Sequence, residues 1–149
     1  MDNRVFSIKM KKKGLVMYEY KTTKKLNMNE LQDLFLALDW DSGNHPEKLT
    51  GAIHASTSVF TAWDGDRLVG LVNVLSDGHM AAYIHYMLVR PECQGHGIGR
   101  RLMDMVADEY ADVPHKVLVA YGQAVGFYKQ CGYHCADGTS PMFMTTLRV

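Results

Sequence analysis

The sequence predicts an α/β fold of the α+β type: a mixed, mostly antiparallel central sheet with helices on both faces, in a single domain over residues 1–149. Three observations predict it. Strand-like and helical apolar patterns follow one another in the order β-β-α-α-β-β-β-α-β-α-β. The turn DGD at 64–66 joins two apolar segments, as in an antiparallel hairpin. A glycine-rich segment, QGHGIG at 94–99, leads from a strand directly into an amphipathic helix.

Composition and length indicate an ordinary globular protein. The 149 residues are enough to bury a core, and 47% of them are apolar while 21% are charged. The apolar runs are too short for a membrane-spanning helix, and the N-terminus lacks the apolar stretch of a secretory signal. The three cysteines do not have the paired spacing of a zinc site. We therefore expect a cytoplasmic protein with reduced thiols, no metal and no membrane contact.

The zero net charge hides an uneven distribution. Residues 1–25 contain eight Lys or Arg and two acidic residues, whereas the remainder contains eight and fourteen. The stretch KMKKKG at 9–14 is interpreted either as a solvated hairpin turn or as a contact for an anionic ligand or partner. No compact basic face with interleaved aromatic residues follows it, so nucleic acid is not an expected partner.

The chain begins with a predicted hairpin and helix. Residues 5–10 and 15–20 flank the lysine-rich turn and have strand patterns. Residues 27–40 place apolar side chains at helical spacing. Asn27 or Asn29 is the expected N-cap of this helix, because an Asn side chain can accept a hydrogen bond from an unpaired N–H of the first turn.

A weaker helical pattern and three strands follow. A helix over 45–56 would begin at Pro46, although Gly51 lowers its helix propensity. Residues 58–78 contain the two strands of the DGD hairpin. Residues 81–89 are apolar and aromatic, so we expect a third strand that ends at the glycine segment.

The last third alternates helices and strands. Residues 98–110 have an apolar helical face, and 115–121 are expected to form a short buried strand. The helical pattern over 122–131 stops at Gly132, as expected for a glycine that follows a helix. Residues 141–149 are expected to close the sheet as a final strand.

The alternating glycines at the start of the predicted helix indicate an anion site. The first N–H groups of a helix have no internal partner, and the helix dipole is positive there. Gly95, Gly97 and Gly99 would let phosphate oxygens approach these groups. A Gly-Lys-Ser/Thr phosphate loop is absent, and Arg100 breaks the dinucleotide pattern G-x-G-x-x-G. The alternative is a tight turn in which glycine serves only a positive φ.

The pattern that does fit is Q-x-x-G-x-G, at 94–99. A second segment, AVGFYKQCGY at 124–133, fits A-x-x-F-Y-x-x-x-G-F with Tyr133 in place of the last Phe. Together they resemble the acetyl-CoA-binding signature of the GNAT family of N-acetyltransferases. The resemblance covers residues 66–149, while the first 65 match in element order only. It implies a single GNAT-like domain with acetyl-CoA as cosubstrate.

The resemblance also implies which residues hold acetyl-CoA. The backbone N–H groups that would cradle the pyrophosphate belong to Gln94, Gly95, His96, Gly97, Ile98, Gly99 and Arg100. Leu88 and Val89 would pair through their backbone with the pantetheine arm. Tyr121 and Phe127 complete the candidate cofactor-binding set. Many relatives have Asn at the position of Tyr121. The resemblance therefore does not imply that this chain makes the polar contact of that Asn with pantetheine.

Two proton-transfer roles are needed when an amine attacks a thioester. In similar enzymes the position of Tyr128 donates a proton to the CoA sulfur; the alternative is a core aromatic residue. His85 is the candidate base, nine residues before Gln94, and the alternative is a structural histidine. Alternation along the strand would put Tyr83, His85 and Met87 on one face, so Tyr83 could share the site.

The acceptor region is less well defined. Trp40 lies between Asp39 and Asp41, where an acid beside an indole could hold a cationic amine. The alternative is a helix C-terminus with solvated acids and a packed Trp. The leading hypothesis is acetylation of a primary amine on a small molecule. Acetylation of a protein N-terminus or lysine, and a non-catalytic acyl-CoA-binding module, are the other hypotheses, and homodimer formation is left open.

Overall fold

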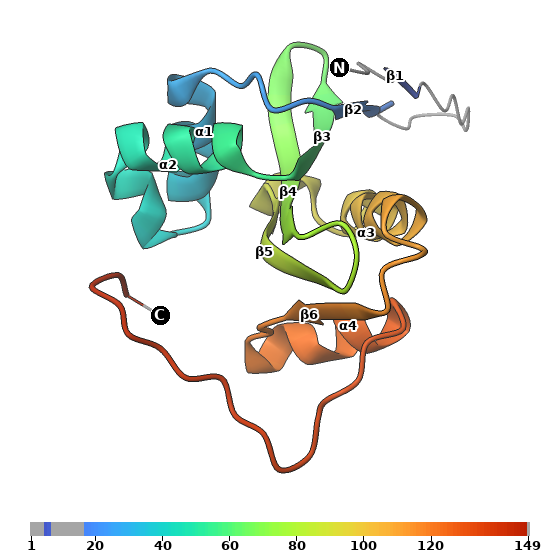
Figure 1. Cartoon of the computed structure of the whole chain (residues 1–149). Coiled ribbons are helices and arrows are strands. Elements are labelled where there is room, and N and C mark those ends of the chain that lie inside the picture. The colour runs from blue at the N-terminus through green and yellow to red at the C-terminus, as the bar shows by residue number, and fades with distance from the viewer. Residues whose placement is uncertain (1–4, 7–16, 149) are drawn as a thin grey trace.

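The structure, a computed structural model, describes residues 5–6 and 17–148. A six-stranded sheet runs through these residues with its strands in chain order. The strands are β1 (Val5–Phe6), β2 (Glu19–Thr22), β3 (Ser58–Asp64), β4 (Arg67–Ser76), β5 (Ala81–Val89) and β6 (His115–Leu118). Neighbours are antiparallel from β1 to β5, and β6 pairs parallel to β5 (Figure 1). The mixed, mostly antiparallel sheet is therefore confirmed.

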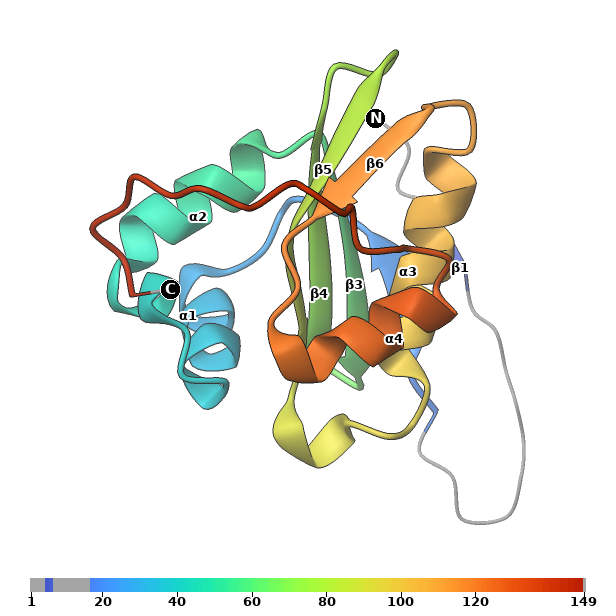
Figure 2. The same cartoon turned by 90° about the horizontal axis from the view of Figure 1, so that it is seen from below.

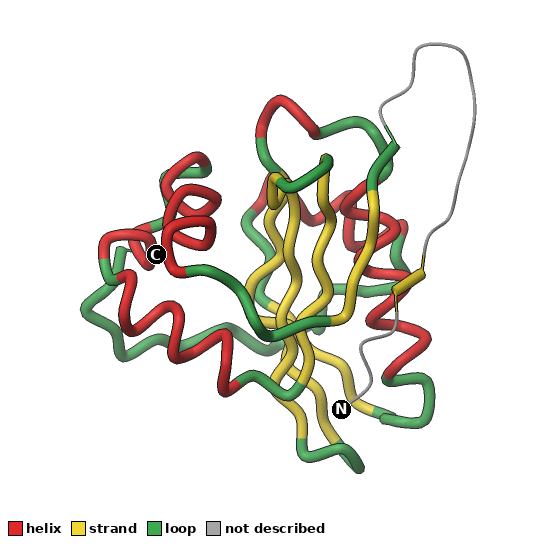
Figure 3. The backbone as a smooth tube through the Cα atoms, turned by 90° about the horizontal axis from the view of Figure 1, so that it is seen from above, coloured by secondary structure: helices red, strands yellow, loops and turns green. Residues whose placement is uncertain are grey.

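Helices cover both faces of the sheet, as predicted (Figure 3). The α-helices are α1 (Met28–Ala37), α2 (Pro46–Ala55), α3 (Ile98–Glu109) and α4 (Val125–Gln130). On one face, α1 and α2 bury side chains such as Phe35 and Ile53. On the other, α3 buries Leu102 and Val106, and Phe127 of α4 packs beside them. Each fully buried side chain of this kind contributes roughly 1.5–3 kcal/mol, so the two apolar clusters fix the helices to the sheet.

The two N-terminal helices begin where the sequence predicts. The side chain of Asn27 caps α1 by accepting a hydrogen bond from the N–H of Asn29 at 2.8 Å. Pro46 is the first residue of α2. Gly51 faces open space, with nothing within 4 Å of the position of a Cβ. It therefore disturbs no contact, and burial of Ile53 anchors the helix.

A β-bulge interrupts the ladder between β4 and β5. The register shifts between Val72 and Val74, so Asn73 faces two residues of β5. These two residues are His85 and Tyr86. The side-chain oxygen of Asn73 accepts a hydrogen bond from the backbone N–H of Tyr86 at 2.9 Å, which satisfies a donor that the bulge leaves without a ladder partner.

The bulge changes the faces on which the β5 side chains lie. Ile84 belongs to the core on the α3 side and Met87 packs against that same core. Tyr86 belongs to the core on the α1 side. The prediction that Met87 shares a face with Tyr83 and His85 is therefore wrong. Apolar and aromatic residues occupy both sides of the bulge, so the sequence pattern gives no sign of it.

Two predicted strands near the C-terminus differ from the expectation. The strand expected at 115–121 ends at Leu118 and is a half-exposed edge strand, not a buried one. Residues 141–148 form no strand. They run from the side of α4 toward α1 and α2 (Figure 2). A strand needs a partner edge for its backbone, and the apolar pattern PMFMTTL carries no information about where such an edge lies.

The N-terminal hairpin is confirmed where it is described, because Val5 and Phe6 pair with Lys21 and Tyr20. The stretch KMKKKG at 9–14 lies outside the described residues. Within the described ranges, no helix is long and apolar enough to cross a bilayer. The same residues contain no group of three His, Cys, Asp or Glu side chains arranged to hold a metal ion.

Candidate active site

The glycine loop after β5 has the geometry that an anion site requires. Gly95 and Gly97 have φ angles of 79° and 81°, a conformation that favours glycine. Gly97 is the N-cap of α3, and no described side chain caps this helix. A Cβ on either glycine would meet nothing within 4 Å. The first N–H groups of α3 therefore lie beside open space at the positive end of the helix dipole, where a phosphate fits.

Gly99 has a different role from the other two glycines. A Cβ on Gly99 would lie 3.3 Å from Cζ of Phe127 and 3.4 Å from Cε of Met87, at the limit of ordinary van der Waals contact. Gly99 therefore allows α4 to lie against α3. A Cβ at this position would press on the ends of the Phe127 and Met87 side chains, so packing within the protein already favours glycine here. The neighbouring Ile98 is buried in the core, so only its backbone is available to a ligand.

The side chains of Gln94 and Arg100 are tied to the protein rather than directed toward a ligand. The amide Nε2 of Gln94 donates to the carbonyl oxygen of Val89 at 3.0 Å, which links the loop to the end of β5. Arg100 donates through Nε to Asp104 at 3.0 Å and through NH1 to the carbonyl oxygen of Gln130 at 3.0 Å. The Arg100 guanidinium thus joins α3 to α4, and the role predicted for Arg100 depends on its backbone N–H.

The sheet opens between β5 and β6. β6 pairs with β5 only over Ala81–Ile84, while β5 continues to Val89 (Figure 2). Along this second half of β5, the described strands provide no partner on the β6 side. A strand that continues beyond its neighbour leaves backbone donors and acceptors free to bind an extended ligand.

The hydrogen-bond pattern shows which residues face this open edge. The N–H of Arg90 donates to the carbonyl oxygen of Val69 at 2.8 Å, so Val89 and Gly70 form a non-hydrogen-bonded pair. The backbone groups of Val89 therefore point away from β4, and by alternation those of Met87 do so too. Leu88 directs its own backbone groups to β4, which does not favour its predicted pairing with pantetheine. Sequence reasoning did not predict that the backbone of Met87 faces the open edge. The residue pattern does not show which residues of β5 form hydrogen bonds with β4.

Aromatic side chains form a continuous group beside the bulge. His85 stacks on Tyr86 with 3.9 Å between ring centroids and on Tyr83 with 5.4 Å. Tyr86 meets Trp40 edge-on at 5.5 Å, and Trp40 meets Tyr121 at 6.0 Å. We call these five residues the aromatic group. It brings His85 and Tyr83 together as predicted, and adds Tyr86, which simple alternation assigns to the opposite face.

The electrostatic state of His85 suits a proton acceptor. Its imidazole lies between two tyrosine rings, and this burial lowers the pKa of His85 below its ordinary value of 6.5. The imidazole is therefore neutral at pH 7 and has a free lone pair. The hydroxyl of the neighbouring Tyr86 is held by Ser42, with 2.7 Å between the two oxygens.

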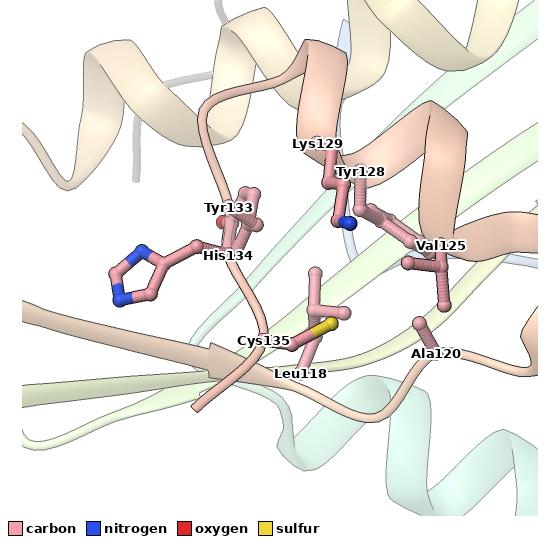
Figure 4. Close-up of a pocket in the computed structure, with 8 residues that line it drawn as sticks. All are labelled: Leu118, Ala120, Val125, Tyr128, Lys129, Tyr133, His134 and Cys135. Atoms are coloured by element: carbon pink, nitrogen blue, oxygen red, sulfur yellow. The ribbon is translucent and has the colours of Figure 1, made fainter. Parts of the chain in front are cut away.

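Tyr128 lies on α4 and lines a small pocket of about 50 Å³ (Figure 4). The pocket is lined by Leu118, Ala120, Val125, Tyr128, Lys129, Tyr133, His134 and Cys135. The ring of Tyr128 meets Phe127 at 5.1 Å and Tyr133 at 6.2 Å. Burial raises the pKa of Tyr128 to about 12, so the phenol keeps its proton and can donate it. The aromatic contacts of Tyr128 and of His85 involve different rings.

Comparison with known proteins agrees with this geometry. The family described as "Acetyltransferase (GNAT) domain" matches residues 36–143. The chain belongs to the GNAT family of acetyltransferases. It is 27% identical over 127 residues to an uncharacterized N-acetyltransferase of Porphyra purpurea, over 81% of this chain and 73% of that protein. It is 33% identical over 79 residues to the peptidyl-lysine N-acetyltransferase YiaC of Escherichia coli (strain K12), over 50% of this chain and 49% of that protein.

A solved structure extends the similarity to the whole fold. A GNAT family acetyltransferase from Streptococcus pneumoniae TIGR4 superposes with a TM-score of 0.77 and 25% identity, over 87% of this chain and 99% of that one. The GNAT fold and the acyltransferase class of this enzyme are therefore shown. The predicted resemblance, drawn from the glycine loop and the α4 motif, is confirmed.

In this GNAT enzyme the C-terminal segment reaches the region around Trp40. The side chain of Arg148 pairs with the carboxylate of Asp39 at 3.0 Å and donates to its carbonyl oxygen at 2.8 Å. The backbone N–H of Arg148 donates to Asp41 at 3.1 Å. The guanidinium of Arg148 thus engages Asp39, and its backbone N–H engages Asp41. Neither interpretation of these acids from the sequence included a contact with the C-terminal segment.

Proposed function

We propose that this enzyme transfers the acetyl group of acetyl-CoA to the primary amine of a small molecule. The observation that carries the proposal is the open edge of β5 that ends in the glycine loop. The loop offers backbone donors at the positive end of α3 for a pyrophosphate. The edge offers the backbone of Met87 and the N–H of Val89 for an extended chain such as pantetheine, while the carbonyl oxygen of Val89 already accepts from Gln94. These two features fit the two chemically different halves of CoA.

The chemistry requires proton transfers at both reacting atoms. The amine arrives largely as an ammonium at neutral pH, and His85 accepts its proton directly or through a water, then passes it to solvent. The amine nitrogen bonds to the acetyl carbonyl carbon, the carbon–sulfur bond breaks and the sulfur leaves as a thiolate, while the nitrogen loses its second proton to His85 or water as the amide forms. Tyr128 supplies the proton that neutralises this thiolate, because its phenol stays protonated near pH 7. In this proposal the backbone N–H of Met87, on the open edge of β5, orients the carbonyl.

The aromatic group supports a small amine as acceptor. It lies beside β5 at the bulge, and its rings can contact the apolar part of an amine or the face of its cation. Arg148 engages the acids on both sides of Trp40, so the C-terminal segment lies against this side of the acceptor region. A small molecule tolerates such a neighbour, whereas a peptide requires a long open groove.

Peptide lysine is the second candidate acceptor. Its support is the similarity to the peptidyl-lysine N-acetyltransferase of Escherichia coli, which is limited to 50% of this chain. A panel of acceptors tests both candidates: arylalkylamines and polyamines against lysine peptides of matched charge, with thiol release from acetyl-CoA as the readout. Turnover of small amines is the expected result. Turnover of peptides alone would favour the second candidate, and CoA binding without any turnover would indicate a non-catalytic binding module.

A further inference from the structure

A contact from outside the matched motifs reaches the glycine loop. Tyr18 lies just before β2, and its hydroxyl oxygen is 2.7 Å from Nδ1 of His96, 78 positions later in the chain. The two rings also stack, with 5.9 Å between centroids and 27° between planes. His96 stands between Gly95 and Gly97, and its side chain is exposed. The side chain of His96 is therefore held by Tyr18 at one of its two ring nitrogens.

The direction of this hydrogen bond decides what the other nitrogen of His96 can do. Burial, followed by the neighbouring Cys93 thiol, raises the pKa of Tyr18 to about 12, so its hydroxyl keeps a proton to donate. A neutral imidazole has one N–H, so when Nδ1 accepts a hydrogen bond the proton is on Nε2. The Nε2–H is then a side-chain donor on an exposed residue, one position before the N-cap of α3. It would add to the backbone N–H donors of the loop.

We propose that Tyr18 is a positioning residue: by holding Nδ1 of His96, it presents Nε2–H to a phosphate oxygen of CoA. The inference rests on the proposed function, since it needs a CoA pyrophosphate at the loop. It assigns a role in cofactor binding to Tyr18, which lies outside the two matched motifs. It also gives a reason for a histidine between the two glycines. A hydrogen bond from a neighbour to one ring nitrogen fixes the proton on the other, which then becomes the donor.

Binding measurements with CoA test whether Tyr18 acts through His96. Tyr18→Phe keeps the ring and its stacking but removes the hydroxyl. Calorimetry should show CoA affinity about fivefold weaker, the size of one net hydrogen bond. His96→Ala should weaken CoA binding at least as much, and adding Tyr18→Phe to it should cause no further loss. His79→Ala, a histidine deletion in the β4–β5 turn, is the matched control and should leave CoA affinity unchanged. A further loss in the double variant would overturn the proposal.

The tautomer of His96 gives a readout that a purely structural role would not move. In protein labelled with ¹⁵N-histidine, NMR should show Nε2 protonated in the free wild type and a mixture of tautomers in Tyr18→Phe. Inorganic pyrophosphate should shift the Nε2 signal in the wild type and shift it less in Tyr18→Phe. A proton on Nδ1 in the free wild type would contradict the proposal. Wild-type protein that binds neither CoA nor pyrophosphate would overturn the proposed function instead, while the tautomer would still decide the Tyr18 contact.

Discussion

Tyr128 combines burial with the ability to donate a proton. Because burial raises the pKa of Tyr128 to about 12, ionisation of the phenol does not compete with donation near neutral pH. Tyr128→Phe keeps the ring contacts with Phe127 and Tyr133, so CoA affinity and thermal stability should change little. The chemical step should slow by about 100-fold, a size typical of acid catalysis, and single-turnover kinetics would measure it. Full activity of this variant would mean that water protonates the leaving sulfur.

The base role of His85 predicts a specific pH dependence. Burial lowers the pKa of His85, so the neutral form persists below pH 6.5 and the acid limb of the rate profile should have its midpoint below that value. In His85→Ala this limb should disappear. The defect should shrink from about pH 7 to pH 9, because raising the pH supplies free amine without a base. A defect of constant size across the pH range would show that His85 is structural.

The same pKa shift has a consequence for stability. The unfolded chain binds a proton at His85 near the ordinary value of 6.5, before the folded protein does. This residue therefore lowers the free energy of unfolding as the pH falls through 6.5, and has no such effect well above it. The enzyme keeps a histidine at some cost in stability at acid pH, which agrees with a functional use of its neutral form.

At the scale of single elements, substitutions at two glycines distinguish backbone strain from loss of space for a ligand, because the two glycines have the same backbone conformation. Gly97 in the loop and Gly78 in the β4–β5 turn have φ angles of 81° and 77°, and both face open space. Gly97→Val and Gly78→Val should each destabilise the protein, by about 1–3 kcal/mol, because a branched side chain is strained at positive φ. In calorimetry, CoA affinity should fall at least about tenfold in Gly97→Val only. An equal loss in both variants would exclude a phosphate at Gly97.

The sequence predicts local elements well and their register poorly. Asn27 and Gly132 carry end signals that act within a few residues, so α1 begins and α4 ends as expected. The faces of β5 depend instead on a bulge opposite Asn73, which is a relation between two strands. The open edge also depends on a relation between strands. Its backbone groups belong to Met87 and Val89 because of the hydrogen bonds that β5 forms with β4.

The site residues divide in the same way. The glycine loop and the α4 motif are contiguous in sequence, so their spacing carries a recognisable signal. The aromatic group joins Trp40, Tyr86 and Tyr121, which lie far apart in the chain and meet only through the fold. The contact between Tyr18 and His96 is of this second kind, with 78 positions between its partners. No local pattern marks either of them.

At the scale of the whole molecule, the C-terminal segment is held across the structure by exposed charges. Arg148 and Asp39 are 63% and 90% exposed, so their ion pair contributes no more than about 1 kcal/mol and is screened by salt. Arg148→Gln, or about 1 M NaCl, should therefore speed cleavage by chymotrypsin after Phe143 severalfold, while the melting temperature changes little. Arg67→Gln breaks the exposed Arg67–Glu92 pair instead and should leave cleavage unchanged. Equal cleavage of wild type and Arg148→Gln would show that apolar contacts, rather than these charges, hold the segment near Trp40.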